Sequence, residues 1–303
     1  MIEVSVLMPT YNHENFISEA INGVLIQKTT FPFKLIIGED HSTDNTANII
    51  REYIEKYPDI VYAIFNTYNK GAVLNSINLL SASSSKYIAI CDGDDYWTDP
   101  YKLQKQVDFL EANPNYSFVG HHVKILYNLD GSTTNFKEFI NNPIRLKDTV
   151  LGSPIHPSSF VALNNMGLPQ RLKSLPACDD PLICHWASYG LGHSIPEYMS
   201  VYRLSQSGTW SVLSKSDQEF IMMRIRLWIF SYYRPLLKTQ AMRIGNNFKN
   251  ILKTDPGKLK KLSLRSWLAL PIPLLVFTNI VLTNQIIKLT NKWLKKSHIK
   301  TYF

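Results

Sequence analysis

The chain has 303 residues, of which 45% are hydrophobic and 18% are charged. This length and polarity exclude a disordered protein and are typical of one main globular domain with an appendage. The three cysteines form no Cys-x-x-Cys pair and have no metal-ligand spacing with the histidines, which excludes a disulfide framework and a zinc site and fits a reducing cytoplasm. They are Cys91, Cys178 and Cys184.

The net charge of +8 is unevenly distributed along the chain. Residues 1–210 carry 15 basic and 21 acidic side chains, whereas residues 211–303 carry 17 basic and 3 acidic ones. The basic character therefore belongs to the C-terminal third, and we expect the chemistry in the acidic part. We accordingly expect a main domain over residues 1–211 and a helical, basic extension over residues 212–303.

Short apolar runs alternate with segments of helical periodicity through about the first 120 residues. Nearly continuous hydrophobic strands predict a mostly parallel sheet with helices on both faces. Ser42 or Thr43 is the expected cap of the second helix. Beyond residue 123 the pattern predicts loops up to about Pro181. In chain order the expected strands are 4–8, 33–38, 60–65, 87–91 and 117–123, and the expected helices are 16–27, 45–56, 72–80 and 102–113.

Polar clusters follow three of the predicted strands. They are Thr10-Tyr11-Asn12, Glu39-Asp40 and Asp92-Gly93-Asp94-Asp95. Because parallel sheets bind their ligands beyond the carboxyl ends of the strands, these clusters predict a binding site at one edge of the sheet.

The acidic turn Asp92–Asp95 is the strongest chemical signal. Two carboxylates separated by one residue can share a hard divalent cation, and the intervening glycine permits the tight backbone that this requires. Such a cation would neutralise a diphosphate. The alternative is an ordinary solvated turn, since Asp and Gly are common in any turn. The position directly after a buried strand and before Tyr96-Trp97 favours the metal site.

Three blocks in a fixed order resemble bacterial family-2 glycosyltransferases of the surface-polysaccharide type. The blocks are SVLMPTYNHENFISEAINGVLIQ, LIIGEDHSTDNT and YIAICDGDDYWTDPYKLQKQVDFLEANP. The resemblance covers about the first 115 residues and resumes at 178–211. It implies an α/β chain of the GT-A nucleotide-diphospho-sugar transferase fold, which is Rossmann-like with a mixed, mostly parallel sheet. Residues 1–115 would bind the nucleotide-sugar, and residues 116–211 would supply the acceptor side and the catalytic base.

The resemblance also implies an inverting glycosyltransferase. It would move a hexosyl or N-acetylhexosaminyl group from a nucleotide-sugar, with uridine diphosphate as the expected nucleotide, to a glycan or polyprenyl-linked acceptor. A non-catalytic nucleotide-sugar-binding or scaffold protein on the same fold is the alternative, because a fold does not guarantee chemistry.

Donor-binding roles follow from the same resemblance. Pro9 and Tyr11 would border the nucleobase, and an aromatic ring can stack on a base. Asp40 would bond the base imide, with Glu39 as a competing candidate and capping of the following helix as the alternative role for Asp40. Asn75 would line the donor site, although a helical asparagine is commonly just solvated.

The metal and the base are assigned in the same way. Asp94 would ligate Mn²⁺ or Mg²⁺, and Asp92 would reach the metal or the ribose. Asp179 would be the general base, because the family motif aligns on Pro181-Leu182. Asp180 is the runner-up, and either of the pair would also serve as a helix cap.

Arg203 could bind the diphosphate as a bidentate donor, with a surface ion pair as the alternative. The family often places a histidine two residues later, where this chain has Ser205, and a hydroxyl is a poorer ligand than imidazole for a transition metal. Possible substitutes are His121, His122 and His156, although isolated histidines are commonly structural.

The basic tail suggests a membrane surface. Residues 266–287 carry no charge and could just span a bilayer, but their prolines and amides weaken that case. We expect helices on the anionic cytoplasmic face of the membrane, with Trp267 and Trp293 near the headgroups, or a homodimer interface through the same helices. The N-terminus has no leader typical of export, so we expect a cytoplasmic, peripheral protein. No groove-reading or base-stacking module is recognisable, so we expect no nucleic-acid partner.

Overall fold

The computed structural model describes residues 4–128, 130–136, 141–150, 152–169, 172–204 and 213–233, together with 246–247, 250–251, 253–255 and 257–258. The chain forms two compact units, Met1–Leu213 and Ser214–Phe303.

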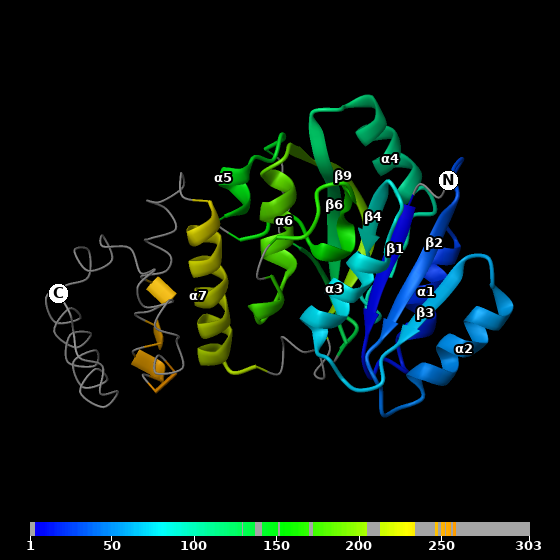
Figure 1. Cartoon of the computed structure of the whole chain (residues 1–303), viewed down its shortest axis with the longest axis horizontal. Coiled ribbons are helices and arrows are strands. Elements are labelled where there is room, and N and C mark those ends of the chain that lie inside the picture. Colours follow the sequence, from blue (N-terminus) through cyan, green and yellow to red (C-terminus); the bar gives the residue numbers. More distant parts are fainter. Residues whose placement is uncertain are drawn as a thin grey trace, which may run out of the picture. The chain divides into compact units, whose positions relative to one another are not determined.

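The first unit is built around a mixed sheet (Figure 1). Within the described residues the strand order is β3-β2-β1-β4-β8-β6-β9-β5, and β7 pairs with β6. Strands β1 to β4 run parallel, as do β6 and β9, whereas β8 is antiparallel to β4 and β6, and β5 is antiparallel to β9. The bounds are β1 Val4–Thr10, β2 Phe33–Glu39, β3 Val61–Phe65, β4 Tyr87–Ile90, β5 Tyr96–Trp97, β6 Tyr116–Tyr127, β7 Thr133–Asn135, β8 Val161–Leu163 and β9 Leu191–Leu204.

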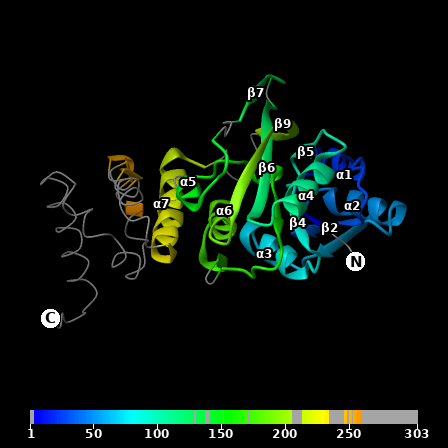
Figure 2. The ribbon, with the colours of Figure 1, turned by 90° about the horizontal axis from the view of Figure 1, so that it is seen from above.

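Helices cover both faces of this sheet, as Figure 2 shows from above. Successive side chains of β1 point to opposite faces, so Val6 and Met8 pack in one core and Leu7 packs in the other. The first core is closed by α1, α2 and α4, and the second by α3 and α6. The bounds are α1 Ile17–Leu25, α2 Thr46–Lys56, α3 Ala72–Ala82, α4 Lys102–Ala112, α5 Leu146–Thr149 and α6 Asp179–Ala187, with 3-10 turns η1 Pro157–Ser159 and η2 Leu172–Ser174.

The expected α/β architecture with a mixed, mostly parallel sheet is confirmed, but two local predictions are wrong. Neither Ser42 nor Thr43 caps α2, since the helix begins at Thr46 and the Thr46 amide donates to Asp44 Oδ1 at 3.0 Å. Ser42 and Thr43 instead bond Asn12 in the loop after β1. The stretch after residue 123 is also not simply loop, because β6 continues to Tyr127 and β8 follows within it.

Lys102 is the one fully buried lysine among the described residues. Its ammonium donates to Gln106 Oε1 at 2.8 Å and lies 3.9 Å from the centre of the Trp97 ring. The Gln106 amide in turn donates to the carbonyls of Val119 and Ser159, which ties α4 to β6 and η1. Burial away from water lowers the pKa of Lys102 from 10.5 to about 7.

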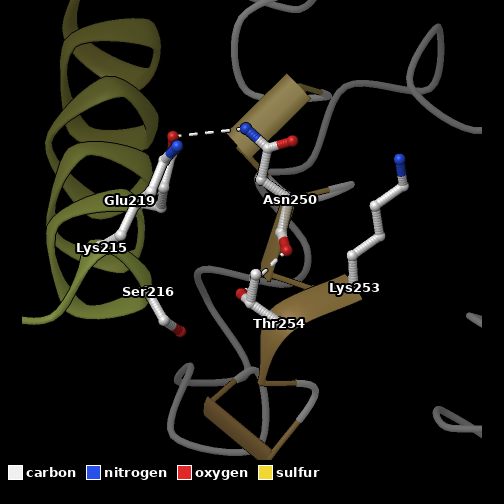
Figure 3. Close-up of a pocket in the computed structure, with 6 residues that line it drawn as sticks. All are labelled: Lys215, Ser216, Glu219, Asn250, Lys253 and Thr254. Atoms are coloured by element: carbon white, nitrogen blue, oxygen red, sulfur yellow. Dashed lines mark hydrogen bonds between the residues drawn. The ribbon is translucent and has the colours of Figure 1, made fainter.

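The second unit contains α7, which spans Lys215–Tyr232 and starts at an N-cap where the Asp217 amide donates to Ser214 Oγ. Beside it lies a small open pocket of about 170 Å³ (Figure 3). Asn250 Nδ2 donates to Glu219 Oε1 at 3.3 Å across this pocket. The lining residues are Lys215, Ser216, Glu219, Asn250, Lys253 and Thr254.

Among the helices that the structure describes, none is both long enough and apolar enough to cross a membrane. The uncharged stretch 266–287, with Trp267 and Trp293, lies outside the described residues. The membrane-surface and homodimer predictions for this tail therefore stay predictions.

Replacing Lys102 with methionine should flatten the dependence of stability on pH. Between pH 7 and 10 the unfolded lysine is protonated and the folded one is not, so wild-type stability rises with pH by up to about 1.4 kcal/mol per unit from this group. The Lys102→Met protein lacks this contribution. Urea unfolding of both proteins at several pH values measures the difference. Lys105→Met should keep the wild-type slope, since ion pairs raise the pKa of Lys105, and parallel curves for Lys102→Met would contradict the assignment.

Candidate functional site

The carboxyl ends of β1, β2 and β4 meet at one edge of the sheet, as the polar clusters predicted. Thr10 is in register with Glu39, and Leu7 is in register with Ile90. The loops that follow are joined by backbone hydrogen bonds, because the Gly93 amide donates to the Pro9 carbonyl at 3.1 Å and the Asp40 amide donates to the Thr10 carbonyl at 3.0 Å. The structure thus places the three polar clusters side by side.

Gly93 lies where no side chain fits. A Cβ atom at this position would stand 2.1 Å from Thr10 Oγ1, 2.8 Å from His13 Nδ1 and 3.2 Å from Ile17 Cδ1. The acidic turn can therefore pack directly against the loop after β1 only because residue 93 is glycine. Thr10 Oγ1 and His13 Nδ1 are themselves buried and make no hydrogen bond in the described structure.

Asp92 and Asp94 are the partly solvent-accessible carboxyl groups of the turn. The Asp94 side chain is 20% exposed, and its Oδ2 lies 3.8 Å from His13 Nε2. Asp92 is half-buried, and burial together with the charges of Asp179 and Asp94 raises its pKa well above the usual range for a carboxyl group. Three carboxyl groups from two distant segments are therefore close enough to repel one another.

Asp95 has a structural position. Its side chain is buried, Oδ1 accepts from the Arg203 amide at 2.9 Å, and Oδ2 has no hydrogen-bond partner. His156 Nδ1 lies 4.0 Å from that Oδ2. Burial lowers the pKa of His156 to about 3, so its ring is neutral and accepts from Ser158 instead. This contact is not an ion pair.

On the donor side, Asp40 is buried and fastens the loop before α3. Asp40 Oδ1 accepts from Asn66 Nδ2 and from the Lys70 amide, and Oδ2 accepts from the Gly71 amide at 2.8 Å. Asp40 therefore does not cap α2. The competing candidate, Glu39, is also buried and accepts from the Ser42 amide.

Asn75 is buried in this network, where it bonds the Gly38 carbonyl and Asn66 Nδ2. Its amide supports the loop around Asp40, and it is not the solvated side chain that a surface helix would carry. Tyr11, in contrast, has an exposed ring, 42% accessible, and Pro9 lies half-buried beside it at the end of β1.

Asp179 and Asp180 open α6, but neither is the cap, since Cys178 occupies that position. Asp180 Oδ1 accepts from the Ser153 amide at 3.0 Å and so anchors the segment before η1. Solvent reaches the Asp179 side chain, yet the surrounding protein atoms and the charge of Asp180 raise its pKa to about 6. Asp179 is thus ionised at neutral pH and readily protonated.

Two residues near the carboxyl groups carry no assignment from the sequence. His13 approaches Asp94, as described above. Tyr202 packs its ring 4.2 Å from that of His156, and burial raises its pKa, helped by the negative charges of the site. These charges belong to Asp92, Asp94, Asp95 and Asp179. The position of His13 directly after the first polar cluster is the signal that could have identified it.

The substitutes considered for the missing histidine do not gather at Asp94. His121 Nδ1 bonds the His122 carbonyl, and both rings are buried in β6 with an Nε2 that has no hydrogen-bond partner. Ser205 itself lies outside the described residues. Within the described part of the chain, no three His, Cys, Asp or Glu side chains are grouped closely enough to hold a metal ion by themselves.

Residues 5–166, more than half of the chain, match the sequence profile of glycosyl transferase family 2. The chain belongs to this family. The predicted family and the GT-A fold are therefore confirmed. Rv1520, an uncharacterized protein of Mycobacterium tuberculosis, is 33% identical to this family-2 chain over 213 residues, which are 68% of the chain and 60% of Rv1520. The chain thus spans less than two thirds of the length of that relative.

Two further likenesses agree with the family. The putative teichuronic acid biosynthesis glycosyltransferase TuaG of Bacillus subtilis is 28% identical over 222 residues, covering 70% of this chain and 85% of TuaG. The crystal structure of S. aureus TarS 1–349 in complex with UDP-GlcNAc superposes with a TM-score of 0.64 at 17% identity, covering 91% of this chain and 84% of that one. At this identity the structural likeness shows the fold alone.

Replacing Gly93 with alanine should distort the acidic turn, because the added Cβ would overlap Thr10 Oγ1. We expect a loss of about 1–3 kcal/mol in the free energy of unfolding. Denaturant melts measure the loss. The double variant Gly93→Ala/Thr10→Ala removes the nearest clashing atom and should recover part of it. A Gly93→Ala protein as stable as the wild type would contradict this packing.

Proposed function

We propose that this family-2 protein is an inverting glycosyltransferase that moves a sugar from a nucleoside-diphosphate sugar to a hydroxyl group of a surface or lipid-linked glycan. The observation that carries the proposal is that the start of α6 packs, through Cys178 and Leu182, in the same core as Ile90 at the end of β4. This packing brings Asp179 within electrostatic reach of Asp92 in the acidic turn. A direct transfer requires a base near the diphosphate-binding site. The likeness to TuaG supports a cell-envelope glycan as the acceptor.

Asp179 would act as the general base. In the transfer, the acceptor hydroxyl loses its proton to the Asp179 carboxylate while its oxygen forms a bond to the anomeric carbon. The bond from that carbon to the diphosphate oxygen breaks, and its electron pair leaves with the nucleoside diphosphate. Attack from the face opposite the leaving group inverts the anomeric centre. The pKa of about 6 suits this role, because Asp179 is ionised at neutral pH and can hold the proton it receives.

Asp94 and Asp92 would hold a divalent cation, with Mn²⁺ or Mg²⁺ as the candidates. The residues fit such an ion, because their carboxylates are ligands that both metals accept, and because burial and the charges of Asp179 and Asp94 raise the pKa of Asp92. The cation would neutralise negative charge on the departing diphosphate. Since these side chains do not form a closed cage, the remaining ligands would come from the diphosphate and from water.

The exposed ring of Tyr11 offers a stacking surface for the nucleobase, with Pro9 beside it. Asp40 accepts three hydrogen bonds from the loop before α3, and its carboxylate retains capacity for the base imide. Asn75 would act indirectly by holding this network. The UDP-GlcNAc bound in the TarS structure makes a UDP-sugar our first choice of donor.

We further propose that the basic tail brings the enzyme to the anionic inner face of the cell membrane, with dimerisation through the same segment as the other outcome. Residues 211–303 carry 17 basic and 3 acidic side chains, and this excess supports attraction to anionic lipid.

Asp179→Asn should abolish transfer while leaving donor binding intact. The amide cannot accept the proton, so we expect kcat to fall by about 10²–10⁴-fold. Product formation from a panel of nucleotide-sugars measures kcat, and calorimetry measures binding of UDP with Mn²⁺. Asp180→Asn is the matched control, since an asparagine Oδ1 can still accept from the Ser153 amide. Equal losses in the two variants would count against Asp179 as the base.

Asp94→Ala should remove the metal-dependent part of UDP binding. Thermal shift with UDP, measured with and without Mn²⁺, reports this part directly. Asp99→Asn changes a nearby carboxylate that pairs with Lys105 and should behave as wild type. Full activity of the Asp94→Ala variant would contradict the role of Asp94 as a metal ligand. Donor binding by the wild type without turnover on any acceptor would favour the non-catalytic alternative.

A further inference from the structure

Arg203 links three elements around the acidic turn. It lies near the end of β9, where Val201 pairs with Tyr96 of β5, and its side chain is only 8% exposed. The sequence predicts that Arg203 either binds the diphosphate or forms a surface ion pair. Its contacts in the structure are with the protein, and they include an ion pair with Glu19.

Two hydrogen bonds join Arg203 to consecutive residues of the turn. Its backbone amide donates to Asp95 Oδ1 at 2.9 Å, and its guanidinium Nε donates to the Asp94 carbonyl at 3.0 Å. Arg203 therefore holds the turn at two points. Its side chain binds the carbonyl of Asp94, and its backbone amide binds the side chain of Asp95. The orientation of the Asp94 carboxylate depends on the peptide that follows Asp94, because both share the same Cα.

The other end of the guanidinium is held by α1. Its Nη2 donates to Glu19 Oε2 at 2.5 Å, an interaction between residues that are 184 positions apart. The guanidinium also lies 4.8 Å from the centre of the Phe16 ring and 5.2 Å from that of Tyr96. Two aromatic faces and a carboxylate thus confine the planar group, a geometry that an ammonium group cannot reproduce.

We propose that Arg203 is a positioning residue, which locks the Asp94 peptide so that the Asp94 carboxylate is held ready for the divalent cation without itself touching the diphosphate. This inference rests on the proposed function. Mutation of a neighbour that orients a metal ligand typically lowers metal affinity by about 10–100-fold.

The test separates metal binding from nucleotide binding. Mn²⁺ affinity is measured by electron paramagnetic resonance without nucleotide, and UDP affinity is measured by calorimetry in the presence of a chelator. For Arg203→Lys we expect the Mn²⁺ dissociation constant to rise by about tenfold or more, and the metal-free UDP dissociation constant to stay unchanged. Glu19→Gln keeps an acceptor oxygen and should show a smaller rise in the first quantity only.

Lys105→Met is the matched control. Lys105 also bridges two carboxylates, Asp99 and Glu197, and Glu197 lies on the same strand as Arg203. The Lys105→Met variant should leave Mn²⁺ affinity unchanged even if its melting temperature falls. If Lys105→Met weakens Mn²⁺ binding as much as Arg203→Lys does, the effect is one of general stability, and the proposal is overturned.

Two other results would also overturn it. Weaker metal-free UDP binding by Arg203→Lys would make Arg203 a direct diphosphate ligand. Wild-type Mn²⁺ affinity in Arg203→Lys would remove the positioning role alone. If the wild-type protein binds Mn²⁺ only with UDP present, the same comparison is made at saturating UDP. A wild-type protein that binds no Mn²⁺ under either condition would instead overturn both this inference and the proposed metal site. If Arg203→Lys folds poorly, the Mn²⁺ dissociation constant of Glu19→Gln decides whether the proposal stands. This variant alters only one exposed partner of the guanidinium and should fold.

Discussion

Repulsion among four carboxyl groups is the constraint on which the site depends. Asp92, Asp94 and Asp95 share one turn, and Asp179 lies at the start of α6. Burial and the charges of Asp179 and Asp94 together raise the pKa of Asp92. Such a cluster is unfavourable in the absence of a cation, so the surrounding fold must hold it together. The holding groups are backbone amides, a glycine with no room for a side chain, and the guanidinium of Arg203, whose positive charge opposes the repulsion.

Burial divides the polar residues of this edge into two classes. Asp40, Asn75, Asp95 and Arg203 are buried, and they donate to or accept from protein groups. Tyr11, Asp94 and Asp179 are reached by solvent. The first class shapes loops, although Asp40 keeps capacity for one further hydrogen bond, and the second can meet a ligand. The proposed chemistry accordingly uses few of the polar side chains that are gathered at the site.

Hydrophobic periodicity predicted the strands and helices of the first 120 residues closely, because buried parallel strands and amphipathic helices leave strong local patterns. It missed β5, which has two residues and is too short to show a period. Beyond residue 123 it also missed the three-residue strands β7 and β8 and the long strand β9. The cluster of Asp92, Asp94 and Asp179 could be predicted from the family motifs. The pairing of Arg203 with Glu19 could not, since nothing local to either residue signals a partner 184 positions away.

The double attachment of β9 bears on how relatives of this chain could be recombined. Through Glu197 the strand is tied to Lys105 of α4, and through Arg203 it is tied to the acidic turn and α1. A graft that exchanged the segment before β9 but shifted its register by one residue would turn these side chains to the opposite face. Chimaeras built to alter acceptor choice should therefore place their junctions outside β9, so that the entire strand comes from one parent protein.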